Sequence, residues 1–456
     1  MTARDADAGS AGNVGAGARP ARRLLVLSYF FPPHAGGGVH RVLGFTRYLP
    51  AHGWECTVVC AGERDFWVHD PSLLKRIDPR TEVVRVPGGS APAAWLRMRR
   101  NESGSRSQET FGVLRRLADW WLIPDPYIGW SARGRAAGER MLARGRFDAM
   151  LSSSPPDSVH LAAAALKQRF GLPWVADFRD PWMGLHHRTP PTAWHAGRQS
   201  ALEQRVLERA DVVLTATRAH ADLLEGRSAG RAQRVVHLPN GFEPNDAAVA
   251  AEDVDPERFL IVFTGTLFRM PDAEIFLEAL HEMLAHDPAA RRRVRVRFAG
   301  PYETGYADRS IALGLTPGIV DFLGPIAHAD TRALQRRADL LVLWKMERME
   351  ATVPGKLYEY LDSGRPLIAL LADRDDAALL LERTAGERVA PGDRAGLIAA
   401  LERHYAQWKD RGRAGAQRPE WLADHTRARL AGRLAAELDT VVGAGLRHPR
   451  RGIEHR

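Results

Sequence analysis

A chain of 456 residues exceeds what one hydrophobic core ordinarily supports, so we expect two domains with terminal tails. Hydrophobic residues make up 45% of the chain and charged residues 26%, a balance typical of a globular protein. The net charge of +9 comes with only five lysines, and no zinc-ligand set, aromatic RNA-binding motif or long basic run accompanies it. We therefore predict no nucleic-acid partner and favour attraction to phosphates or to an anionic membrane surface.

The ends of the chain and its cysteines indicate a compartment. Residues 1–20 are rich in Ala, Gly and Arg and lack an apolar core like that of a secretory leader, so we expect a disordered tail there. A second tail is expected at residues 446–456. Cys56 and Cys60 both lie in an apolar, strand-like stretch and do not make a disulfide framework. No apolar run is long enough to span a membrane, and these features together predict a cytoplasmic protein.

Strand and helix patterns alternate along the chain, which predicts parallel sheets covered by helices. In the first half, strands are expected at residues 22–29, 55–60, 81–86, 147–152, 173–178 and 211–215, and helices at residues 39–49, 111–122 and 159–170. In the second half, strands are expected at residues 259–267, 293–300, 320–324, 340–344 and 366–371, and helices at residues 273–284, 356–361 and 423–441. The pattern favours two doubly wound, Rossmann-like α/β domains at residues 21–240 and 241–415.

A run of three glycines follows the first predicted strand. In sheets of this kind, ligands bind beyond the carboxyl ends of the strands. Gly36, Gly37 and Gly38 let backbone N–H groups approach a phosphate closely, so they are candidate ligand-binding residues. The spacing is not that of the dinucleotide-binding fingerprint, and a plain flexible turn remains the alternative interpretation.

The second candidate loop opens the helix predicted at residues 356–361. Gly355 sets up the helix start, whose free N–H groups attract a diphosphate, and Lys356 adds a positive charge to the same group. Glu359 lies one turn further, where its carboxylate is placed to accept hydrogen bonds from ribose hydroxyls. The alternative is an amphipathic helix carrying a solvated Lys–Glu pair.

The third candidate loop ends the first strand of the second half. Gly265 permits close approach of a ligand, while Thr266 and Arg269 supply a hydroxyl and a guanidinium for phosphate. An ordinary surface role for Arg269 is the alternative interpretation.

The ordered set of motifs resembles the retaining glycosyltransferases of sequence family 4. Its members are SYFFPPHAGGGVHR, IPDPYIGW, SSSPPDSVHLAA, PWVADFRDPW, LPNGFE, the Gly-Thr-Leu strand end, VDFLG and PGKLYEYLDSGRP. The resemblance covers most of residues 22–400. It implies the GT-B fold, in which two Rossmann-like domains face each other across a cleft. It also implies a final helix, at residues 416–445, that returns to the first domain.

The same resemblance implies the chemistry. A nucleotide-diphosphate sugar is the donor and is held between the domains, while a hydroxyl acceptor lies mainly against the first one. The enzyme is expected to be a hexosyl- or N-acetylhexosaminyltransferase, with no permanently bound cofactor and no essential metal. Lys356 and Arg269 are expected to stabilise the departing diphosphate while the acceptor attacks on the same face of the sugar.

The family pattern is incomplete at the donor sugar. Members often carry two glutamates separated by seven residues, the second of them on the ribose. Glu359 fits the second position, but Ala351 occupies the first, with Glu347 and Glu350 as nearby substitutes. The basic pair that usually follows the Gly-rich strand end is reduced to Arg269.

On the acceptor side, Asp177, Arg179 and Asp180 follow a strand expected to end at the cleft. The paired acids, with Asp180 as the catalytic candidate, are placed to orient an acceptor hydroxyl, and a structural ion network of Asp177, Arg179 and Asp180 is the alternative. His160 begins the helix after SSSPP, and the resemblance implies contact with the donor sugar. A structural histidine is the competing interpretation.

Other functions remain open from the sequence. A nucleotide-sugar 2-epimerase shares this cleft without needing an acceptor, and a catalytically silent nucleotide-sugar-binding partner fits the departure at Ala351. The acceptor is either a lipid-linked saccharide, as in bacterial polysaccharide assembly, or a small soluble metabolite. Residues 111–122 carry Arg115 and Arg116 beside Trp120 and Trp121, a pattern of peripheral contact with an anionic membrane or, alternatively, of a core helix.

Overall fold

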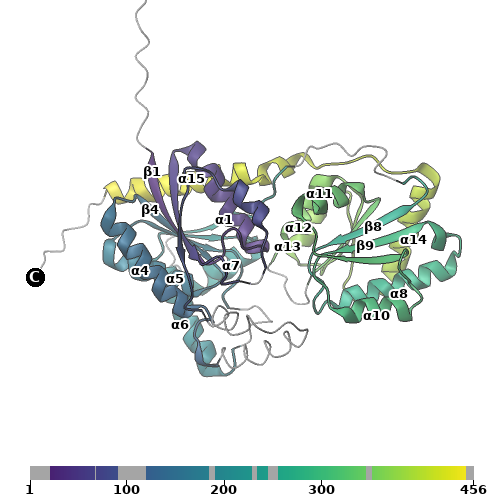
Figure 1. The fold of residues 1–456 in the computed structure, drawn as a ribbon, viewed down its shortest axis with the longest axis horizontal. Coiled ribbons are helices and arrows are strands. Elements are labelled where there is room, and N and C mark those ends of the chain that lie inside the picture. The colour runs from purple at the N-terminus through teal and green to yellow at the C-terminus, as the bar shows by residue number, and fades with distance from the viewer. Residues whose placement is uncertain are drawn as a thin grey trace, which may run out of the picture.

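The computed structural model describes residues 21–66, 68–90, 120–183, 190–228, 234–244, 255–345 and 352–447. Figure 1 shows two domains side by side, each built from a sheet with helices on both faces. All strand pairings in both sheets are parallel. The predicted fold class, two facing doubly wound α/β domains, is confirmed.

The first sheet has seven strands in the order β3-β2-β1-β4-β5-β6-β7 within the described residues. They are β1 (Arg22–Ser28), β2 (Trp54–Ala61), β3 (Glu82–Val86), β4 (Ala149–Ser154), β5 (Trp174–Phe178), β6 (Val212–Thr215) and β7 (Val235–His237). The strand order reverses between β1 and β4, so the loops after these two strands open a crevice at the carboxyl edge.

The second sheet has six strands in the order β10-β9-β8-β11-β12-β13 within the same described parts of the chain. They are β8 (Phe259–Thr264), β9 (Val294–Ala299), β10 (Val320–Gly324), β11 (Leu340–Trp344), β12 (Leu367–Leu370) and β13 (Glu387–Val389). Here the order reverses between β8 and β11. Two of the candidate loops, after β8 and after β11, therefore flank the same crevice.

Helices cover both faces of each sheet because their apolar residues recur at helical spacing. In the first domain, α1 (Gly37–Tyr48) packs on one face, and α4 (Ile128–Arg144), α5 (Ser158–Phe170) and α6 (Ala193–Arg209) pack on the other. The helix α7 (Arg218–Ser228) precedes β7.

In the second domain, one face of the sheet carries α8 (Pro271–His286), α10 (Thr304–Ala312) and α14 (Arg394–Arg411), and the other carries α11 (His328–Arg337), α12 (Gly355–Ser363) and α13 (Asp376–Leu381). A single turn, α9 (Ala290–Arg293), leads into β9.

The last helix, α15 (Arg427–Arg447), runs back along the first domain beside α1 (Figure 1). Leu430, Leu434 and Leu438 are buried in the core that α1 shares with the first sheet. Asp439 accepts a hydrogen bond of 2.9 Å from the Trp54 indole and pairs with Arg22. The helix begins later than the predicted residue 423, because residues Glu420–His425 form a 3₁₀ helix.

Part of the predicted helix at residues 111–122 lies outside the described residues, which resume at Trp120. Trp120 and Trp121 are 51% and 84% exposed, and Trp194 near them is 67% exposed. The rings of Trp120 and Trp194 both contact His195, with centroid distances of 5.3 Å and 5.0 Å. In the described part of the chain, no helix combines the length and apolarity needed to cross a bilayer.

Candidate active site

A cavity of about 450 Å³ lies between the two domains. The first domain and the connecting segment supply Gly37, Gly38, His40, Arg41, Arg179, Asp180, Asn240 and Gly241 to its wall, and the last helix supplies Arg427. The second domain supplies Met270, Trp344, Lys345, Thr352, Val353, Pro354, Gly355, Lys356 and Glu359. The N-termini of α1 and α12 both contribute residues, so two sets of free backbone N–H groups favour an anion in this space.

Lys356 is the least compensated cation of the second domain's wall. Its ammonium lies 3.9 Å from the centroid of the Phe263 ring, a cation–π contact. Burial lowers the pKa of Lys356 to about 7, and the charge of Glu359 opposes this shift only in part. A diphosphate beside this ammonium would supply the missing negative charge, and the lysine would then be protonated.

Gly265 makes room for this lysine. Its backbone has a φ of +124°, and a Cβ built on it would lie 2.8 Å from Nζ of Lys356. A second glycine, Gly300, supports the loop from the other side, because a Cβ there would lie 2.2 Å from the carbonyl oxygen of Gly265. The structure therefore brings together the loop after β8 and the helix start after β11.

Glu359 lines the cavity, and contacts with Gln335 and Arg332 position its carboxylate. Its Oε2 accepts a 3.3 Å hydrogen bond from Nε2 of Gln335 and lies 3.9 Å from Nη1 of Arg332. Gln335 is itself buried and donates to Oγ1 of Thr264 at the end of β8. A carboxylate anchored in this way retains lone pairs for hydroxyl groups of a ligand.

The other candidates of the β8 loop lie apart from this group. Thr266 is exposed, and Arg269 borders a neighbouring, open cavity of about 530 Å³ with Met270 and Glu303. The backbone N–H of Arg269 donates to Glu303 at 3.0 Å, and its φ of +50° is unusual for a residue with a side chain. Met270 borders both cavities, so Arg269 lies beside the interdomain cavity without lining it.

The glycine run after β1 reaches the cavity at its second and third members. Gly37 and Gly38 begin α1 and line the cavity, whereas Gly36 precedes the helix with a φ of +113°. Gly38 is in close contact with Arg179, because a Cβ at Gly38 would lie 2.2 Å from Nη1 of that arginine. The glycine at this position therefore lets a guanidinium enter the cavity wall.

The acidic residues after β5 divide into two roles. Asp177 is completely buried, pairs with Arg41 at 2.7 Å and accepts a 2.7 Å hydrogen bond from Ser153. Asp177 thus has structural partners, but they differ from those of the predicted Asp177–Arg179–Asp180 ion network, because its arginine is Arg41 of α1. Asp180 pairs with Arg179 at 2.8 Å, and both of these residues line the cavity.

The structure does not bring His160 to the cavity. Its ring is completely buried, stacks on Phe178 at a centroid distance of 4.3 Å and has Nδ1 2.8 Å from Oγ of Ser152. Burial lowers the pKa of His160 to about 3, so this imidazole is neutral at physiological pH. These contacts are those of a core histidine. Ala351, Glu350 and Glu347 lie outside the described residues.

Sequence reasoning missed several residues of the cavity wall. Arg41 and His40 come from within α1, and Arg427 comes from the distant start of α15. His40 and Arg41 end the motif SYFFPPHAGGGVHR, which was identified without assigning them a role, whereas no motif marks Arg427. Lys345 could have been predicted as a site residue, since it is one of five lysines in an arginine-rich chain and directly follows a buried strand. Its ammonium pairs with Asp375 and donates a 2.8 Å hydrogen bond to the carbonyl of Thr352.

Metal binding was predicted to be unnecessary. Over the residues that the structure describes, no group of three or more His, Cys, Asp or Glu side chains is arranged to hold a metal ion. Metal independence stays a prediction for experiment.

Two family models match the chain and together cover every strand of both sheets except β1. The model for the glycosyl transferase 4-like domain matches residues 36–241, and the model for glycosyl transferases group 1 matches residues 258–407. Every cavity-lining residue except Arg427 falls within these two ranges.

Curated relatives match over shorter stretches. The chain is 29% identical over 153 residues to a D-inositol 3-phosphate glycosyltransferase of Rhodococcus opacus. This stretch covers 31% of this chain and 34% of that protein. It is 26% identical over 258 residues to D-inositol 3-phosphate glycosyltransferase 2 of Catenulispora acidiphila, covering 52% of this chain and 58% of that protein. The matches thus span between a third and three fifths of these relatives.

Among solved structures, Anabaena HepE in complex with UDP and glucose is similar to this chain, with a TM-score of 0.56 and 16% sequence identity. The match covers 93% of this chain and 98% of that one. At this identity the likeness establishes a shared fold.

Proposed function

Because the chain belongs to the family 4 glycosyltransferases, whose two domains the matching models describe, we propose that it transfers a sugar from a nucleotide-diphosphate sugar to a hydroxyl acceptor with retention of configuration. The observation that carries this proposal is the grouping at the β8–β11 crevice: Lys356 and Glu359 line one interdomain cavity, and Gly265 makes room for Lys356.

In the proposed complex, the diphosphate of the donor lies against the N-terminus of α12 and the ammonium of Lys356. Both favour negative charge, and both act most strongly when the sugar–phosphate bond breaks and charge accumulates on the leaving group. Glu359, held by Gln335, accepts hydrogen bonds from the ribose hydroxyls. The UDP and glucose named for the HepE complex support a donor of this class.

The acceptor occupies the side of the cavity that the first domain supplies, near Gly38, Arg179 and Asp180. Its hydroxyl attacks the anomeric carbon on the face that the diphosphate leaves, and a departing phosphate oxygen takes the hydroxyl proton. No permanently bound cofactor takes part in these steps. Arg269, beside the cavity, meets the outer phosphate when the domains close.

We further propose that the enzyme works at the surface of an anionic membrane. The exposed Trp120, Trp121 and Trp194 suit the interface of a bilayer, where an indole places its apolar body in lipid and its N–H in water. A lipid-linked acceptor is the natural substrate for such a location, and we propose the cytoplasmic face of the membrane as the site of action.

The experiment is an assay of purified protein with UDP- and GDP-sugars, an extract of candidate acceptors and EDTA, analysed by mass spectrometry and by NMR of the new anomeric centre. We expect an acceptor-dependent product with retained configuration, formed in the presence of EDTA. An isomerised donor without acceptor would identify an epimerase. Tight donor binding without turnover would identify a silent binding partner, and rescue by magnesium would contradict metal independence.

A further inference from the structure

On the side of the interdomain cavity that the connecting segment borders, which we call the hinge side, two arginines share one carboxylate. Glu243, on the segment between the domains, is approached by two arginines: Nη2 of Arg76 at 3.1 Å and Nη1 of Arg427 at 3.7 Å. Its other oxygen accepts a 2.6 Å hydrogen bond from the Tyr48 hydroxyl. One carboxylate thus faces two guanidinium groups. The charge of Glu359 also acts on Arg427, but this carboxylate lies 3.9 Å from the Arg332 guanidinium and is shared with it.

Arg427 lines the cavity and lies against two glycines. Its side chain is 8% exposed, and a Cβ built on Gly44 of α1 would lie 2.6 Å from its Cδ. A Cβ on Gly241 would lie 3.3 Å from its Cγ. A larger residue at Gly44 would occupy the space of this stem, whereas at Gly241 a Cβ would first meet Leu430 and the carbonyl of His425. The glycine of α1 therefore makes room for the arginine of α15.

Buried polar atoms at the hinge side lack hydrogen-bond partners among the described residues. Nε of Arg427 is buried and has no hydrogen-bond acceptor among the described residues, and Nδ1 of His40 beside it is also buried without a partner there. Both side chains line the cavity. The His40 ring lies 5.3 Å from that of His328, which comes from the second domain. Burial lowers the pKa of Arg427, which is what an under-compensated cation shows.

We propose that Arg427 and His40 form an anion subsite at the hinge side of the cavity, which binds a phosphate or carboxylate group of a substrate other than the donor diphosphate. A buried cation without full compensation is costly, and an anionic ligand removes that cost by pairing with it. The diphosphate already has Lys356 and the N-terminus of α12 in the second domain. Arg427 enters from the side of the first domain, where the acceptor is proposed to bind.

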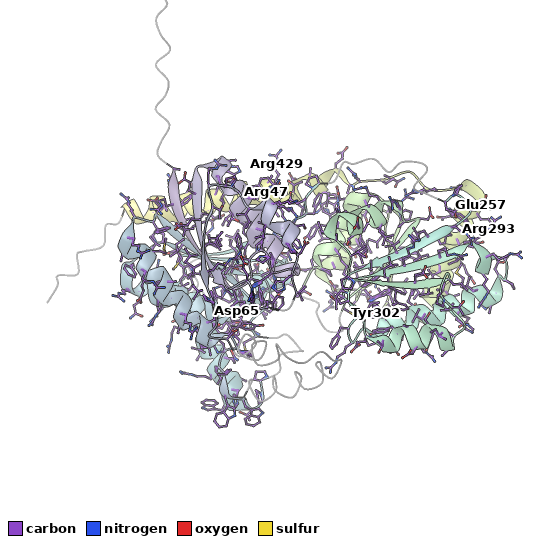
Figure 2. The ribbon with its side chains drawn as sticks, viewed as in Figure 1. Arg47, Asp65, Glu257, Arg293, Tyr302 and Arg429 are labelled. Atoms are coloured by element: carbon purple, nitrogen blue, oxygen red, sulfur yellow. The ribbon has the colours of Figure 1, made fainter. Side chains whose placement is uncertain are left out.

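The location of this subsite rests on the proposed function, whereas its existence is tested by binding alone. We saturate the protein with UDP and then titrate inorganic phosphate in a calorimeter. The same titration is repeated with Arg427→Met, which keeps the stem in its glycine-lined space and removes the guanidinium. The control is Arg429→Ala, an exposed arginine on the outer side of α15 (Figure 2).

We expect phosphate to bind the UDP-loaded wild-type protein and the Arg429→Ala variant equally, and to bind Arg427→Met at least about tenfold more weakly. UDP affinity should stay within about twofold in all three proteins. A double variant, Arg427→Met with Glu243→Gln, removes the carboxylate left behind and should show the same phosphate loss. Circular dichroism and the melting temperature establish that each variant is folded.

Three results would overturn the proposal. The first is an absence of phosphate binding to the UDP-loaded wild-type protein. The second is unchanged phosphate affinity in a folded Arg427→Met or double variant. The third is a loss of UDP affinity with phosphate binding intact, which would assign Arg427 to the donor diphosphate. None of these readouts depends on turnover, so a failure of the proposed glycosyl transfer would be recognised separately.

Discussion

Gly265 and Lys356 occupy one space: a Cβ on the glycine would lie 2.8 Å from the ammonium nitrogen of the lysine. The two residues are far apart in the chain and come from the loops on either side of the β8–β11 crevice. The glycine therefore has two functions, since it adopts a φ of +124° and leaves room for a cation.

Gly265→Ala should weaken donor binding by displacing Lys356. We expect the KM for the donor to rise at least about tenfold, because a misplaced ammonium loses a charge-assisted contact of about 1.5–3 kcal/mol. Gly318→Ala is the matched control. Gly318 also has a positive φ, of +90°, but a Cβ there meets nothing within 4 Å. Equal kinetic effects in the two variants would reduce the role of Gly265 to backbone conformation.

Donor affinity should depend on pH through Lys356. The free lysine has a pKa of about 7, lowered by burial, and only its protonated form attracts the diphosphate. Below pH 7 the lysine is protonated, so its contribution to the affinity should be constant. Above pH 7 the free enzyme loses the proton that the complex needs, so the Kd for UDP should rise up to about tenfold per pH unit.

Lys356→Arg is the control for this pH profile. An arginine stays protonated over the whole range, so the Kd for UDP in this variant should be nearly independent of pH between 6 and 9. A wild-type profile that is flat over the same range, measured by calorimetry, would show that Lys356 is not the titrating group.

Glu359→Gln should weaken recognition of the nucleoside. The amide keeps the shape of the side chain but replaces one acceptor with a donor, so one ribose hydroxyl loses its partner. We expect about a tenfold increase in the Kd for UDP and no change in the Kd for inorganic pyrophosphate. Glu382→Gln, on an exposed position of the same domain, provides the control. Equal losses for both ligands would place Glu359 on the diphosphate instead.

Trp121→Ser should reduce association with anionic vesicles in a flotation assay, because its indole is 84% exposed and free to enter an interface. Leu379→Ser removes a large apolar side chain, 51% exposed on the second domain, and should float like the wild type. A wild-type protein that stays with the soluble fraction at low salt contradicts the membrane proposal, and it would favour a soluble acceptor.

The fold and the grouping of residues at the β8–β11 crevice were predictable because their signals are local. Gly355, Lys356 and Glu359 stand within one turn of a helix start, and Gly265 ends a strand whose apolar run is evident in the sequence. Alternating strand and helix periods then place both loops at the carboxyl edge of one sheet.

The remaining residues of the site depend on tertiary packing. Arg427 reaches the cavity because α15 crosses back to the first domain, and Arg41 is oriented by an ion pair with Asp177, which is far from it in the chain. For His160 the sequence predicted a site residue that the structure places in the core. Its position at a helix start suggested a ligand contact, but the ring is buried by stacking on Phe178, a contact that no local pattern reveals.

The most direct test of the account is the affinity of UDP for Lys356→Ala, measured by calorimetry beside Lys409→Ala, whose lysine lies near the end of α14 outside the cavity lining. We predict that Lys356→Ala weakens UDP binding roughly ten- to a hundredfold with the melting temperature maintained, and that Lys409→Ala binds like the wild type. A folded Lys356→Ala protein with wild-type affinity for UDP would contradict the assignment of this cavity to a nucleotide-diphosphate sugar.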